Sequence, residues 1–267
     1  MIWTNEQGLF LQRHDQLGER DWRYDDCFKL IFSPYGKGEY QTHDGDRSIG
    51  EEEFFIMNPK VEHKQLRATQ EKFLVELTPS LLQEAAQKMG VHHTHIEFST
   101  VSYRHRQMIQ WATFMREFLS NQKEGVSALF LENSLVQLSI LMVEYGVGSH
   151  QKELPISSGS EPVYRVISAL KESYIEQWSL DEMAGVARMN KFQFAHAFKK
   201  ETGLSPYSWL QVYRLFRSQQ EIIFTEHSIL SIAIKHGFAN VAAFNHLFKK
   251  MYHKTPTQFR HFHKMNQ

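Results

Sequence analysis

A repeat within the back half of the chain constrains its fold more than any other feature. The segment FAHAFKK at 194–200 returns as FNHLFKK at 244–250, an offset of 50 residues. At the same offset, GLSP at 203–206 returns as HKTP at 253–256, each with a proline that follows the helix. Upstream, LDEMA at 180–184 corresponds to ILSIA at 229–233, at an offset that is one residue shorter. Self-similarity at a nearly fixed offset indicates one structural unit used twice.

Local signals indicate where the helices of each copy begin and end. Ser179 and Glu182 have the spacing of a capping box, in which each side chain satisfies a free amide at the start of a helix. Asn190 is a good N-cap for the second helix, and Gly203 ends it. A small residue in each short helix lets its partner helix approach closely. The pattern therefore predicts two helix-turn-helix units.

The second helix of each unit divides into two faces. Phenylalanines four residues apart are expected to be buried, in both copies. The opposite face is predicted to meet bases in the major groove of DNA, through Lys191, Phe192, Ala195 and His196 in the first copy and Val241, Ala242, Asn245 and His246 in the second. Lysine pairs near the helix ends are suited to backbone phosphates, namely Lys199, Lys200, Lys249 and Lys250. A duplicated structural hairpin with solvated lysines is the alternative interpretation.

The charge distribution is consistent with a nucleic-acid partner for this half. The formal net charge is +0, but residues 1–155 hold 16 Lys+Arg against 22 Asp+Glu, and residues 156–267 hold 14 against 8. Seven of the fifteen histidines also lie in the back part. Opposite halves indicate two modules with different partners, of which the basic one is suited to phosphates.

The whole chain is predicted to have an α+β fold. Residues 1–80 alternate apolar and polar positions between turn signals, as in a small β-barrel or β-sandwich, and residues 81–146 carry two helical patterns. Residues 147–162 are rich in Gly, Ser and Pro, as a linker is. Residues 163–267 form the all-α module with its two helix-turn-helix units. A longer helix over 206–224 joins the two copies.

Residues 163–260 resemble the DNA-binding domain of AraC/XylS-type bacterial transcription regulators. The matching segments are Leu180…Met183-Ala184, Asn190…Phe194, Phe198-Lys199, Gly203…Ser205-Pro206, Arg214-Leu215, Ser228-Ile229…Ile232-Ala233, His236-Gly237-Phe238, Phe244…Phe248-Lys249 and Thr255-Pro256…Phe259-Arg260. The front half is similar, more loosely, to the cupin-type effector domain of that family, on Gly36-Lys-Gly38, Asn58-Pro59 with His63, and Leu77-Thr-Pro79.

The resemblance implies a function and its partners. It implies a sequence-specific regulator that binds promoter sites in double-stranded DNA and is controlled by a small-molecule effector in the barrel. It also implies a homodimer formed by the helices over 81–146, and RNA polymerase as a partner if the protein is an activator. Whether Leu138 and Leu141 face a second subunit or the core is open. No cofactor is expected.

Three positions depart from the family's pattern. His196 and His246 stand where family members often carry Arg, which can pair with guanine through two hydrogen bonds. Together with Val241 and Ala242, which can meet thymine methyl groups, they indicate a site that favours A·T pairs. His253 replaces the usual Gly after the second helix, so a left-handed cap is not predicted there.

Catalysis is the rival class. A cupin enzyme holds a metal with closely spaced histidines, but this sequence offers only His43 and His63 in the strand region. The cluster His92-His93-x-His95 lacks an acidic or Cys partner, and Cys27 is the only cysteine. We therefore expect neither a metal site nor an enzyme. An interaction module with a degenerate DNA-binding domain is the other alternative.

The sequence also predicts the compartment. No stretch approaches 18 apolar residues, and the first residues lack the basic and apolar regions of a secretory signal. A cytoplasmic protein, associated with the nucleoid when bound to DNA and with no membrane partner, is expected.

Overall fold

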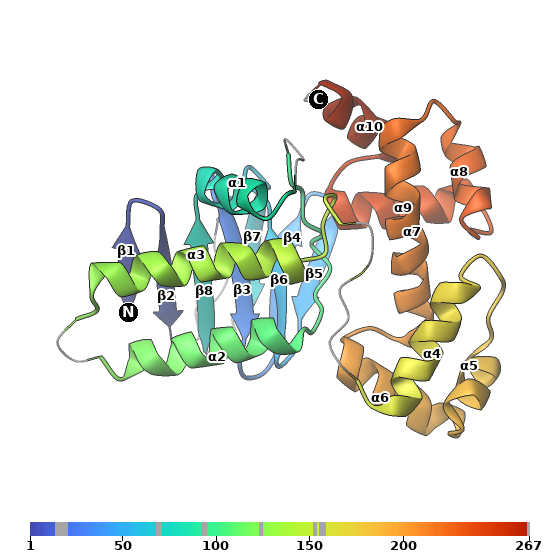
Figure 1. Ribbon diagram of the computed structural model, residues 1–267, viewed down its shortest axis with the longest axis horizontal. Helices are drawn as coiled ribbons and strands as arrows, with labels where there is room; N and C mark the ends of the chain where they lie inside the picture. Colours follow the sequence, from blue (N-terminus) through green and yellow to red (C-terminus); the bar gives the residue numbers. More distant parts are fainter. Residues whose placement is uncertain are drawn as a thin grey trace. The chain divides into compact units, whose positions relative to one another are not determined.

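The computed structural model describes residues 1–13, 21–67, 71–91, 95–122, 125–151, 154 and 159–265. The chain divides into two compact units, Met1–His150 and Gln151–Gln267. The front unit holds β-sheets and helices, and the back unit is helical (Figure 1). The predicted α+β fold is confirmed.

Two antiparallel sheets make up the β part of the front unit. The larger has the order β1 (Ile2–Asn5), β2 (Gly8–Arg13), β8 (Lys72–Leu77), β3 (Phe28–Ser33), β6 (Glu53–Met57). The smaller has the order β5 (Gly45–Ile49), β4 (Gly38–Thr42), β7 (His63–Arg67). Within the described residues, hydrogen bonds join the strands into two sheets rather than one closed barrel.

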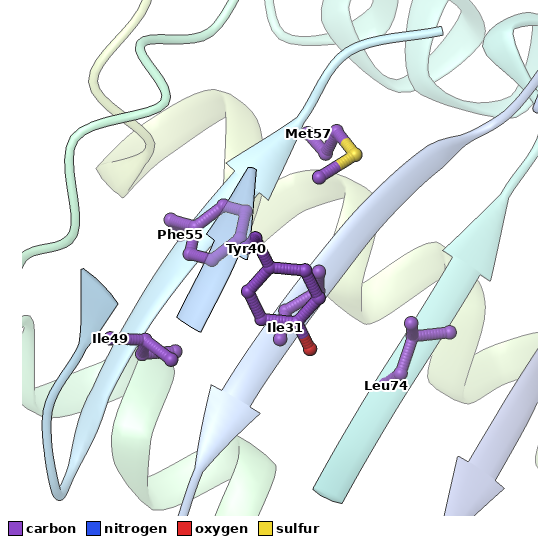
Figure 2. Packing of buried hydrophobic residues seen from close by; sticks show 6 residues of the cluster. All are labelled: Ile31, Tyr40, Ile49, Phe55, Met57 and Leu74. Atoms are coloured by element: carbon purple, nitrogen blue, oxygen red, sulfur yellow. The ribbon is translucent and has the colours of Figure 1, made fainter. Parts of the chain in front are cut away.

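The two sheets pack through one apolar cluster. Figure 2 shows its buried side chains, which come from both sheets: Ile31, Tyr40, Ile49, Phe55, Met57 and Leu74. Because successive side chains of a strand point to opposite faces, the neighbours of Ile31 on β3 face away from this cluster. Every position of β3 is buried, so the larger sheet is covered on both faces at this strand, although the sequence shows alternating phenylalanines and leucine there.

Three helices cover the outer face of the larger sheet: α1 (Pro79–Lys88), α2 (Arg106–Ser120) and α3 (Ala128–Tyr145). The ring of Phe10 on β2 lies 6.3 Å from that of Trp111 on α2. At Gly8, an added Cβ would lie 3.2 Å from Leu135 of α3, so helix and strand are in close contact. Leu138 is fully buried, so the possibility that it faces a second subunit is wrong, because the face of α3 that carries it packs inside the front unit.

The back unit contains α4 (Glu161–Glu172), α5 (Leu180–Ala187), α6 (Lys191–Thr202), α7 (Pro206–Phe224), α8 (Ile229–Lys235), α9 (Val241–Tyr252) and α10 (Pro256–Met265). The long α7 packs against helices of both copies of the repeat and is buried at most positions. The helix predicted over 206–224 is confirmed. Among the described residues, no helix is long and apolar enough to cross a membrane.

Candidate nucleic-acid interface

The two predicted recognition helices, α6 and α9, begin with the same kind of cap. The side chain of Asn190 accepts hydrogen bonds from the amides of Phe192 (3.1 Å) and Gln193 (2.9 Å). Asn240 accepts one from the amide of Ala243 at 2.8 Å. These bonds satisfy amides that have no partner within the helix. The N-cap predicted at Asn190 is confirmed.

Both recognition helices end in a left-handed residue. Gly203 has φ 80°, and His253 has φ 55°. Their amides donate to the carbonyls of Lys199 and Lys249 respectively, each at 2.9 Å. The sequence did not predict a left-handed cap at His253. The left-handed conformation costs about 1–2 kcal/mol for a residue with a Cβ. At His253 this cost is offset in part by the hydrogen bond that its amide donates to Lys249.

One face of each recognition helix is anchored by aromatic side chains. Phe194 and Phe198 of α6 are fully buried, and Phe198 meets Trp209 of α7 edge-on at 6.2 Å. In α9, Phe248 is fully buried and contacts Phe259 of α10 at 5.1 Å. These contacts fix the rotation of each helix about its axis. They confirm the burial predicted from the four-residue spacing.

The short helices α5 and α8 lie close to the recognition helices. Ala184 and Ala233 are buried, as the sequence predicts for helices that approach closely. Ser179 and Glu182 form the predicted capping box at the start of α5. Each copy is therefore a folded helix-turn-helix unit.

The side chains predicted to contact DNA lie on the faces opposite these phenylalanines. The exposed ones are Lys191, Phe192, His196, Lys199 and Lys200 on α6 and Ala242, Asn245, His246, Lys249 and Lys250 on α9, while Ala195 and Val241 are half-buried. Phe192 is 78% exposed, which is unusual for a large apolar ring. Lys191 lies over that ring, 6.0 Å from its centroid, and also pairs with Asp181 at 3.5 Å.

A group of ionisable side chains lies at the junction of α7 and α8. The carboxylate of Glu221 accepts hydrogen bonds from His227 Nδ1 at 2.7 Å, Lys235 Nζ at 3.1 Å and His236 Nε2 at 3.1 Å. Burial raises the pKa of Glu221, but these three donors outweigh it and lower the pKa to about 2. Burial lowers the pKa of His236, and the nearby Glu221 carboxylate only partly opposes this. A neutral His236 therefore donates to an ionised Glu221.

We expect the back unit to lose stability as the pH falls below about 6.5, the ordinary pKa of histidine. A histidine with a lowered pKa in the folded state contributes stability above its unfolded pKa, and that contribution is lost as the pH falls through the folded value. The His236→Gln variant keeps a donor toward Glu221 but does not titrate. Urea unfolding of the full chain at about pH 8 and about pH 5 should show a smaller drop in the variant than in the wild type. Equal drops would contradict the assignment.

The space between the two sheets of the front unit contains polar side chains. Lys29 is buried there and pairs with Asp25 and, at 3.4 Å, with Glu76. His63 is also buried, and burial lowers its pKa to about 4. His43 is exposed, stacked on Trp22 and paired with Glu62. The two histidines therefore do not converge on one site.

The residues considered for catalysis do not form a centre in the part of the chain that the structure describes. No group of three or more His, Cys, Asp and Glu side chains among those residues could hold a metal ion. His92 and His93 lie outside the described residues, whereas His95 is exposed. Burial raises the pKa of the Cys27 thiol to about 12, which keeps it protonated and unreactive at neutral pH.

Comparison with known proteins agrees with this geometry. A family model described as a helix-turn-helix domain matches residues 183–261. Over 102 residues, the chain is 34% identical to a Bacillus subtilis (strain 168) protein named "Uncharacterized HTH-type transcriptional regulator YbfP". That match covers 38% of this chain and 35% of the relative, so the chain spans about a third of the relative's length.

A second relative and a solved structure extend the comparison. "Probable transcriptional regulator LumQ" of Photobacterium leiognathi is 22% identical over 240 residues, covering 88% of this chain and 89% of the relative. The solved DNA-binding domain of AdpA, in complex with a target DNA, is 24% identical, covers 40% of this chain and 97% of that one, and has a TM-score of 0.39. The matched family model and the two copies of the unit lead to one assignment: the back unit of this chain contains a helix-turn-helix domain of the AraC/XylS type.

Proposed function

We propose that this chain is a sequence-specific, DNA-binding transcriptional regulator. The observation that carries the proposal is the presence of two recognition helices, each anchored by buried phenylalanines and each with exposed lysines at its end. An isolated unit of this kind is common, but two copies on one central helix match a bipartite DNA site. The matched relatives named as transcriptional regulators support it. As such a regulator, the protein is cytoplasmic, bound to the nucleoid and not an enzyme.

Base readout is proposed for His196 and His246, which occupy equivalent exposed positions on α6 and α9. Replacing either one by Ala should weaken binding to a selected site by about 1–3 kcal/mol and leave the unfolding free energy nearly unchanged, because both side chains are exposed. Fluorescence anisotropy with a site selected from a random duplex library measures the loss. An equal loss on unselected DNA would show that these histidines contact phosphates and not bases.

The front unit is proposed to bind a small-molecule effector within residues 1–80. Buried polar side chains between the two sheets support this, since such groups give a ligand site its orientation and specificity. An effector that binds one arrangement of the two modules better than another shifts the population toward that arrangement. The linker predicted over 147–162 is shorter in the structure, because residues 147–150 belong to the front unit and Glu161 begins α4. We propose that the segment between them makes such a shift possible. Its residues 152–153 and 155–158 lie outside the described residues.

Dimerisation is proposed for the helices over 81–146, through the outer face of α3. Leu129, Val136 and Ile140 are exposed at helical spacing on that face, at 66%, 37% and 42%. A Leu129→Glu, Ile140→Glu variant should be a folded monomer, because neither side chain belongs to the core. Light scattering after size exclusion measures the mass, and circular dichroism checks the fold. A variant that stays dimeric, or a monomeric wild type, would contradict this interface.

If the protein is an activator, RNA polymerase is a further partner.

A further inference from the structure

The turn between the two helices of the unit occurs twice with the same backbone hydrogen bonds. After α5, the amide of Arg188 donates to Gly185 and that of Met189 donates to Ala184. After α8, the amide of Gly237 donates to the carbonyl of Ile234, and the amide of Phe238 donates to the carbonyl of Ala233. The residues at the same place in this turn are Arg188, with φ 55°, and Gly237, with φ 83°. Both are left-handed.

Backbone conformation alone does not explain why the second turn carries glycine. Arg188 shows that this turn tolerates a side chain, which is exposed there. At Gly237, however, an added Cβ would lie 2.8 Å from the carbonyl oxygen of Ile175 and 3.0 Å from Nε of Arg214. Contacts this short would force the backbone of Ile175 or the side chain of Arg214 to move. The glycine is therefore required by a close approach between this turn and the segment after α4.

This approach joins the second copy of the unit to the segment that leads into the first copy. Ile175 lies between α4 and α5, just before the first copy, and Gly237 lies between α8 and α9, in the second copy. The residues next to them also meet: the hydroxyl of Tyr174 donates to Nδ1 of His236 at 3.4 Å, and the two rings are stacked with centroids 6.0 Å apart. The turn of the second copy thus touches the segment that leads into the first copy, and both copies also contact α7.

Buried polar groups hold each side of this contact in place. Arg214 of α7 is almost fully buried, and it donates from Nε to the carbonyl of Tyr174 at 2.6 Å and from its terminal nitrogen to the carbonyl of Glu176. On the other side, Nε2 of His236 donates to Glu221 of α7, which leaves Nδ1 as the acceptor for Tyr174. Both turns are therefore fastened to the same rigid helix.

We propose that the contact between Tyr174-Ile175 and His236-Gly237 sets the separation and rotation of α6 relative to α9, and so determines which spacing between two DNA half-sites the protein accepts. The inference rests on the proposed function. One inserted base pair moves a half-site by about 3.4 Å along the duplex and rotates it by about 35°. Two recognition helices held rigidly cannot follow that change. Tyr174, His236 and Gly237 are positioning residues in this account.

The rigidity is tested without DNA. In a Cys27→Ser, Leu129→Glu, Ile140→Glu background of the full chain, which keeps one labelled pair per molecule, spin labels are attached at Gln193→Cys and Ala243→Cys. These are exposed and equivalent positions on α6 and α9. We expect one narrow distance distribution by double electron–electron resonance. Gly237→Ala and, separately, Tyr174→Ala should broaden or shift it. Arg188→Ala, the matched change in the first copy's turn, should leave it unchanged. Unchanged distributions in both Gly237→Ala and Tyr174→Ala would overturn the proposal.

The spacing preference is tested with DNA. A site selected by the wild type from a random duplex library is lengthened or shortened by one base pair between its half-sites. The wild type and Arg188→Ala should lose at least about tenfold in affinity, whereas Tyr174→Ala and Gly237→Ala should lose no more than about threefold from an already weaker optimum. A Tyr174→Ala or Gly237→Ala variant that keeps the sharp spacing preference, with its affinity lowered equally at every spacing or not lowered at all, would overturn the proposal. If the wild type selects no sequence, the proposed function fails, and the label distances still decide whether the contact fixes the two helices.

Discussion

Replacing Glu71 by Ala should destabilise the front unit by about 3–5 kcal/mol. Glu71 lies just before β8, and its carboxylate accepts hydrogen bonds from Gln12 of β2 and Arg116 of α2, both at 2.9 Å. The side chains of Glu71 and Arg116 are only 8% and 12% exposed. Removing Glu71 leaves the largely buried Arg116 with only the more distant carboxylate of Glu117, at 3.5 Å, as an ion-pair partner. That change costs far more than the loss of a surface ion pair. Urea unfolding of the full chain measures the change.

A surface pair in the same unit provides the control. Lys88 and Glu84 form an ion pair at 2.6 Å on α1, but both side chains are exposed. Glu84→Ala should cost less than about 1 kcal/mol, because water screens this pair. In a Glu71→Leu, Arg116→Met variant, stability should return toward the wild-type value, since a buried ion pair is often replaceable by apolar groups. A Glu71→Ala variant as stable as Glu84→Ala would contradict the account.

Replacing the four lysines at the ends of α6 and α9 by glutamine should remove most of the salt dependence of DNA binding. Lys199, Lys200, Lys249 and Lys250 are all exposed in the last turns of their helices. Each phosphate contact contributes about −0.9 to the slope of log affinity against log salt, so four contacts contribute about −3.6. Between about 50 and 200 mM salt, the wild type should lose at least about a hundredfold in affinity through these contacts alone.

The same lysines also stabilise the helix ends, and the control separates the two effects. A positive charge in the last turn of a helix contributes about 0.3–1 kcal/mol through the helix dipole. The quadruple variant should therefore be somewhat less stable but still folded. The exposed Lys37 and Lys88 of the front unit, replaced by glutamine together, should leave the salt slope unchanged. An unchanged slope in the quadruple variant would show that these lysines are only a solvated face.

The local parts of the fold could be predicted from the sequence. Asn190 and Gly203 mark the two ends of α6 through interactions within a few residues of each, and the buried phenylalanines follow from the period of the helix. The amphipathic pattern fixes which face carries His196 and His246. These features depend on interactions between residues that are close in the sequence. The same signals occur in both copies of the unit, which strengthens the prediction for each.

The remaining features depend on contacts between distant segments. Glu71 and Arg116 are 45 positions apart in the sequence. Because charged residues are usually exposed, the sequence alone predicts both at the surface and does not indicate that they form a buried ion pair. Leu138 has the same periodicity whether it faces the core or a partner. Gly237 matches a family motif, but its need for glycine comes from Ile175, which no local pattern places beside it.

The central claim is that both recognition helices read DNA, and site selection from a random duplex library with the full chain tests it most directly. The account predicts an enriched site with two half-sites one helical turn apart, about 10 base pairs from centre to centre. His196→Ala should relax the sequence preference in one half-site, and His246→Ala should relax it in the other, with the remaining half-site unchanged. No enriched sequence, or a single half-site that both variants affect equally, would contradict the account.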